Sequence, residues 1–204
     1  MPSRRRSPAL QYSPGSLPTD ASARRAAQEF ADLVGRVVNT TVSQCPISFH
    51  QVEGREFEGY VSHAEHKVPV PMPLENGRYL YLYQRLGLRR PERYLTTLEY
   101  KYQYQEAEDD ESWVFRYEYQ REPEEGYRYP LAHLHVNGAL ETYTADKPFP
   151  RLHLPTDRVT IESVVQHLVD EHEVACISPQ NSQEVLRRSG EAFAEIQRRR
   201  LLDG

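Results

Sequence analysis

The chain contains the alternating stretch Leu98-Glu99-Tyr100-Lys101-Tyr102-Gln103-Tyr104, in which apolar or aromatic residues occupy every second position. After an acidic segment at residues 106–111, the alternation resumes in Trp113-Val114-Phe115-Arg116-Tyr117-Glu118-Tyr119. Successive side chains of a β-strand point to opposite faces of the sheet, so each stretch predicts a strand with one aromatic face. Together the two stretches predict a long antiparallel hairpin.

A third predicted strand carries two histidines. Residues 127–136 follow a turn at residues 122–126, and they contain the run Leu131-Ala132-His133-Leu134-His135-Val136. Its apolar side chains are expected to join the tyrosines of the hairpin in the core. The opposite face of the sheet then collects the polar side chains of the candidate site: Glu99, Lys101, Arg116, Glu118, His133 and His135. A shift of the register by one residue would instead place the histidines among the tyrosines.

Shorter strands are predicted before this meander. Residues 47–61 alternate around Glu53-Gly54-Arg55 and predict a hairpin. The prolines within residues 68–73 remove alternate backbone donors, so this segment is expected to be an extended connector and not a central strand. Residues 79–82 predict a further strand, which residues 86–91 are expected to interrupt.

Helices are predicted before and after the strands in the order of the chain. Apolar residues recur at three- and four-residue steps over residues 19–39 and again over residues 161–169, after the N-cap candidate Thr160. A last helix, capped by Asn181-Ser182, is expected to end in Arg198-Arg199-Arg200. These patterns predict an α+β fold: an antiparallel β-meander sheet of about five or six strands, packed by an N-terminal helix and two C-terminal helices.

Composition limits the class of protein. Residues 1–18 are rich in Pro and Arg and predict a flexible arm, and residues 19–204 predict a single α+β domain. No apolar run is long enough to cross a bilayer and no secretory signal is present, so a cytoplasmic location without a membrane partner is expected. The net charge of −5 argues against a general phosphate-binding protein, although basic clusters leave room for a local basic surface. Cys45 and Cys176 lie too far apart in the sequence to indicate a disulfide framework or a thiolate zinc site.

The pair His133 and His135 is the main candidate for chemistry. Two imidazoles on one strand face can act as an acid and a base, or they can bind a metal. His153 lies on a second extended segment from which it can reach the same face, and three histidines can hold zinc or iron. The alternative is a solvated pair without a function, and His167 and His172 are expected at the surface of their helix.

The spacing of Gly126, His133, His135 and Glu141 resembles the first motif of the cupin barrels, although both gaps are about one residue longer and the later Gly/Pro/His motif is absent. The resemblance implies a metal-binding enzyme. Its ligands would be His133, His135 and Glu141, with His153 as a further candidate, and its metal would be zinc or iron.

The second half of the chain resembles the TumE-like bacterial toxins, proposed ribonuclease components of toxin–antitoxin pairs. The matching parts are residues 94–118, His133-Leu134-His135-Val136-Asn137-Gly138 and residues 160–170. This resemblance implies a cytoplasmic endoribonuclease that acts on RNA and is restrained by a cognate antitoxin protein.

A mechanism without a metal cofactor fits that resemblance. His133 and His135 would act as base and acid, and Arg116 and Lys101 would stabilise the charged phosphorane. Arg116 also has a simpler interpretation, a cross-strand ion pair with Glu99 or Glu118.

Substrate contacts and partners are less constrained by the sequence. Tyr127 and Tyr143 are candidates for stacking on RNA bases, and His153 is a candidate for binding the substrate. The third hypothesis is a non-catalytic interaction protein, in which the arm and the charged last helix bind another protein. The sequence leaves the oligomeric state open.

Overall fold

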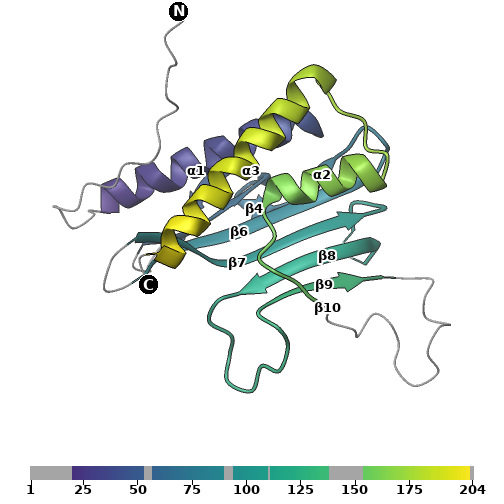
Figure 1. The fold of residues 1–204 in the computed structure, drawn as a ribbon. Coiled ribbons are helices and arrows are strands. Elements are labelled where there is room, and N and C mark those ends of the chain that lie inside the picture. The colour runs from purple at the N-terminus through teal and green to yellow at the C-terminus, as the bar shows by residue number, and fades with distance from the viewer. Residues whose placement is uncertain (1–19, 53–56, 90–93, 110, 138–153, 203–204) are drawn as a thin grey trace, which may run out of the picture.

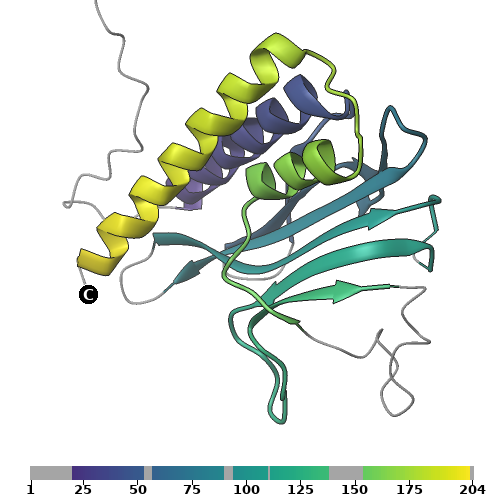
Figure 2. The same ribbon diagram turned by 45° about the vertical axis from the view of Figure 1, so that its right-hand side comes forward.

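Three helices cover one face of an antiparallel β-sheet (Figure 1 and Figure 2). This computed structural model describes residues 20–52, 57–89, 94–109, 111–137 and 154–202. The helices are α1 (Asp20–Thr41), α2 (Ile161–Glu171) and α3 (Pro179–Leu202). The strands are β1 (Ser48–Gln51), β2 (Glu58–Ser62), β3 (Ala64–Glu65), β4 (Val68–Pro69), β5 (Met72–Pro73), β6 (Tyr79–Arg89), β7 (Tyr94–Gln105), β8 (Trp113–Gln120), β9 (Ala132–Val136) and β10 (Leu154–Pro155). The predicted α+β class is confirmed.

The sheet follows the order β1-β2-β6-β7-β8-β9-β10, with β5 also paired to β6 and a separate β3-β4 pair. It is an open path with β1 and β10 at its ends, unlike the closed sheet of a barrel. The predicted hairpins β1-β2 and β7-β8 and the pairing of β9 with β8 are confirmed. In the part of the chain that the structure describes, no helix has both the length and the apolar character needed to span a membrane.

The register places the tyrosines of β7 and Phe115, Tyr117 and Tyr119 of β8 under the helices and the histidines on the other face. Trp113 was expected among the aromatic residues of the core face, but the register shifts at Gln105 and its ring packs against His135 on the other face. Tyr102 pairs with Tyr117, which pairs with Leu134 on β9. One position along, Lys101 pairs with Glu118 and Glu118 pairs with His133. The polar face that the alternation predicted is therefore present.

The tyrosines under the helices are core residues whose hydroxyls have partners inside the protein. Tyr102 donates to Gln84 Oε1 over 2.7 Å, and Tyr100 accepts from the backbone N–H of Val159 over 2.8 Å. Tyr104 accepts from Asn76 Nδ2 over 2.8 Å. Buried hydroxyls need such partners, because an unpaired polar group in the core is costly. The aromatic face is thus explained by packing.

Two strand predictions were wrong in their bounds. β6 runs through Gly87 to Arg89, because Gly87 allows the Leu98 side chain of β7 to lie where a Cβ atom would be. The histidine strand begins at Ala132, not at residue 127. Gly126 adopts a positive φ of 90° in a turn and Pro130 lacks a backbone donor, so the preceding residues cannot all join the ladder.

Two helix predictions also need correction. α3 begins at Pro179, so Ser182 lies in its first turn and not at its cap; its buried hydroxyl donates to Thr40 O of α1 over 3.1 Å. His167 and His172 are not simply surface residues. Both rings contact the core ring of Phe115, at 5.1 Å and 5.2 Å between centroids.

The approach of β1 to β2 requires a glycine at position 59. A Cβ atom there would lie 2.6 Å from the backbone oxygen of His50 and closer still to the ring of Phe49. We expect Gly59→Ala to lower the free energy of unfolding by about 2–3 kcal/mol, measured by urea denaturation. Gly190→Ala in α3, where an added Cβ meets nothing within 4 Å, is the matched control and should be neutral or stabilising. Equal effects at the two positions would contradict this account of Gly59.

Candidate functional site

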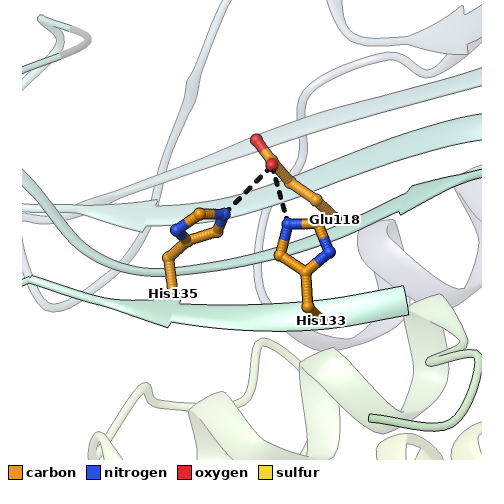
Figure 3. A group of neighbouring side chains, drawn as sticks. All are labelled: Glu118, His133 and His135. Atoms are coloured by element: carbon orange, nitrogen blue, oxygen red, sulfur yellow. Dashed lines mark hydrogen bonds and ion pairs between the residues drawn. The ribbon is translucent and has the colours of Figure 1, made fainter. Parts of the chain in front are cut away.

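Glu118, His133 and His135 converge on the face of the sheet that the helices leave uncovered (Figure 3). The Nε2 atoms of both histidines point at the same carboxylate oxygen, Glu118 Oε2. The distances are 3.3 Å from His133 and 3.1 Å from His135, and the two rings are 4.8 Å apart. The predicted pair of histidines therefore shares one carboxylate as its partner.

Pairing of β8 with β9 brings the three side chains together. Glu118 lies directly opposite His133, and Arg116 lies directly opposite His135. Residues that face each other on antiparallel strands have Cβ atoms about 4.5–5.5 Å apart, which is within reach of long side chains. The histidines are two residues apart on one strand, so both rings can reach the same glutamate.

The histidines are buried although no described helix covers their face. His133 is 1% exposed and His135 is 5% exposed. The ring of Trp113 packs edge-on against His135 at 6.3 Å, and the ring of Tyr129 lies 6.5 Å from that of His133. A pair of solvated surface histidines is thereby excluded, because burial removes most of their contact with water.

Arg116 and Lys101, the two predicted cations, lie on the same face. Arg116 Nε is 2.8 Å from Glu118 Oε1, so the predicted ion pair with Glu118 is present, but both residues lie on β8 and the pair does not cross strands. Its guanidinium lies over the ring of Trp113 at 5.1 Å. Lys101 lies opposite Glu118 in the register of β7 and β8. Its Nζ is 5.3 Å from the ring centre of Tyr81.

The Glu118 carboxyl is held in its ionised form. Burial alone would raise its pKa, but the hydrogen bonds from His133 and His135 and the charge of Arg116 outweigh that effect. The pKa of Glu118 therefore lies well below its usual range. An ionised carboxylate accepts hydrogen bonds or binds a cation, and it cannot donate.

A backbone contact determines which nitrogen of His133 carries a hydrogen. His133 Nδ1 lies 2.7 Å from the carbonyl oxygen of Pro130. A carbonyl oxygen only accepts, so Nδ1 must be the donor in this contact. The other ring nitrogen, Nε2, is the one that faces Glu118.

Two functional candidates are not singled out by the sequence. The alternation assigns Glu118 to the polar cluster of the candidate site but gives it no role there, and its pairing with His133 across the strands shows its position. It also places Tyr129 in a strand, whereas this residue lies in the loop beside the histidines together with Tyr127, and the two tyrosine rings are 5.5 Å apart. The predicted residues Glu141, Tyr143 and His153 lie outside the described residues.

Comparison with known proteins assigns no family to this chain. No protein-family model, no curated protein and no solved structure matches it.

Glu118 is expected to contribute to stability through its buried contacts. We expect Glu118→Gln to lower the free energy of unfolding at pH 7 by about 1–3 kcal/mol, because hydrogen bonds to a charged group are among the stronger ones. Urea denaturation is the measurement. Glu108→Gln, at an exposed glutamate in the β7-β8 turn, is the control. Equal stabilities of the two variants would show that the contacts of Glu118 do not support the fold.

Proposed function

We propose that this chain is a cytoplasmic endoribonuclease whose reacting groups are Glu118, His133 and His135. The supporting observation is the convergence of two buried imidazoles on one carboxylate oxygen, at 3.1 Å and 3.3 Å. Groups that cooperate in catalysis must lie within hydrogen-bond reach of a common point. The resemblance of the meander and the His133-Leu134-His135 strand to TumE-like toxins makes RNA the proposed substrate and an antitoxin protein the proposed partner.

The chemistry of RNA cleavage matches the groups on this face. The 2′-hydroxyl must lose its proton, the leaving oxygen must gain one, and the phosphorane must be stabilised by positive charge. The imidazoles can act on the two oxygens directly, as in the mechanism without a metal, or through an ion that they hold. Arg116 and Lys101 supply the positive charge, and the ion pair of Arg116 with Glu118 uses only one of its three guanidinium nitrogens.

The loop before β9 is the proposed contact for the RNA bases. Tyr129 is 51% exposed and its ring lies beside His133, while Tyr127 packs edge-on against Tyr129. Aromatic rings next to a cleavage site bind single-stranded RNA by stacking on bases, an interaction that tolerates any sequence.

We expect His133→Ala and His135→Ala each to reduce RNA cleavage by about 10²-fold or more, the range typical for loss of a proton-transfer group. The measurement is the cleavage rate of a labelled RNA by the purified full chain, with circular dichroism to show that the fold is intact. His50 is a half-buried histidine on β1, at the opposite end of the strand order from β9. His50→Ala should therefore leave the cleavage rate unchanged. A folded double variant of His133 and His135 with full activity would refute the proposal.

We expect Tyr129→Ala to raise KM for RNA by roughly 10-fold with a smaller change in kcat, since one stacked base contributes about 1–3 kcal/mol. Tyr129→Phe should keep most of the affinity because the ring is retained. Leu131→Ala, at a residue of the same loop that is 46% exposed, is the control and should have little effect. Similar KM values for the Ala variants of Tyr129 and Leu131 would argue against stacking.

A further inference from the structure

We infer that Glu118, His133 and His135 form a binding site for one divalent transition-metal ion, with Zn²⁺ as the ion that fits best. Each residue offers one ligand atom, and the three atoms lie within 4.8 Å of one another. The inference concerns the same site as the proposed function, but it depends only on the three ligands and not on the identity of the substrate.

The hydrogen bond to Pro130 is the first argument. Because Nδ1 of His133 donates to the carbonyl of Pro130, a neutral His133 ring presents the lone pair of Nε2 to Glu118. Glu118 Oε2 also carries lone pairs, and the two atoms are only 3.3 Å apart. Two acceptors at this distance repel each other unless a cation lies between them, so the site requires either a second proton on His133 or a metal ion.

The distances also fit a metal ion. The 3.1 Å contact between His135 Nε2 and Glu118 Oε2 is a hydrogen bond of ordinary length, which a bound ion would replace. Two ligands bound to one ion at about 2.1 Å are separated by about 3.0 Å at a right angle and about 3.4 Å at the tetrahedral angle. The separations of 3.3 Å for His133 and 3.1 Å for His135 fall within this interval.

The surroundings of the three residues resemble those of a metal site. A histidine that binds metal through Nε2 usually donates its Nδ1 hydrogen to a carbonyl or carboxylate, as His133 does to Pro130. Ligating carboxylates are usually held by a second group, and Arg116 Nε contacts the other oxygen of Glu118 at 2.8 Å. The rings of both histidines are buried, which limits competition from water.

The donor set indicates the class of ion. Two imidazole nitrogens and one carboxylate oxygen are typical ligands of catalytic zinc, and of iron in oxygenases, whereas Mg²⁺ and Ca²⁺ prefer oxygen ligands alone. Three protein ligands leave at least one position for a water molecule or a substrate oxygen. A zinc ion in such a site lowers the pKa of the bound water and so supplies a base near neutral pH.

The test is the binding of Zn²⁺ to the full chain after treatment with a chelator, measured by isothermal titration calorimetry and elemental analysis. We expect one Zn²⁺ per chain, and a rise of about 5–10 °C in Tm at a Zn²⁺ concentration of 100 times Kd. The variants His133→Ala, His135→Ala and Glu118→Gln should each weaken Zn²⁺ binding by more than about 100-fold. This loss is larger than the one typical of residues that only hydrogen-bond to a metal ligand. His50→Ala should bind as the wild type does.

The outcomes separate this inference from the proposed function. Failure of the wild type to bind Zn²⁺, or equal loss of binding in His50→Ala and the three ligand variants, overturns the metal site. Because the wild-type titration does not depend on any variant, it tests the metal site even where a ligand variant misfolds. Zn²⁺ binding without RNA cleavage would support the metal site and refute the ribonuclease. RNA cleavage that resists the chelator, without Zn²⁺ binding, would support the ribonuclease and overturn the metal site.

Discussion

The register between β8 and β9 is the constraint on which the site depends. It places Glu118 opposite His133 and, at the next position, Tyr117 opposite Leu134. Because side chains alternate between faces, one register assigns polar residues to one side and aromatic residues to the other along both strands. A shift of β9 by one residue would place His133 and His135 under the helices, among the tyrosines, and separate both from Glu118. Packing of the apolar face against the helices therefore also fixes the register that brings Glu118 next to the histidines.

The two faces satisfy their polar groups in different ways. Under the helices, each core tyrosine hydroxyl has its own partners, such as Gln84 for Tyr102 and both Asn76 and Arg78 for Tyr104. On the other face, two imidazoles and a guanidinium converge on the one carboxylate of Glu118. The first arrangement is what a stable core requires. The second brings three side chains that can bind a metal ion to one point, and this convergence is the basis of the proposed function.

The sequence correctly predicted elements that follow from a local repeat of apolar residues. It missed features that depend on a bend of the chain or on a tertiary contact. The alternation in residues 98–119 correctly predicted the β7-β8 hairpin, and Thr160 correctly predicted the start of α2, where it accepts from the backbone of Ser163. The end of β6 was missed because Gly87 is typical of a strand break in the sequence, whereas it accommodates Leu98 in the structure. The contact of His172 with Phe115 was missed because it depends on how α2 packs.

The amino-acid sequence alone determined the α+β class and that His133 and His135 share one face of their strand, because both follow from side-chain periods of about 3.6 and 2 residues. Only the tertiary structure decided what the histidines contact. Glu118 lies 15 residues before His133 in the chain, and the carbonyl of Pro130 that orients His133 belongs to a loop whose bend no period describes. Pairing between strands and the path of a loop are long-range or irregular features, so the chemistry of the pair emerged only with the fold.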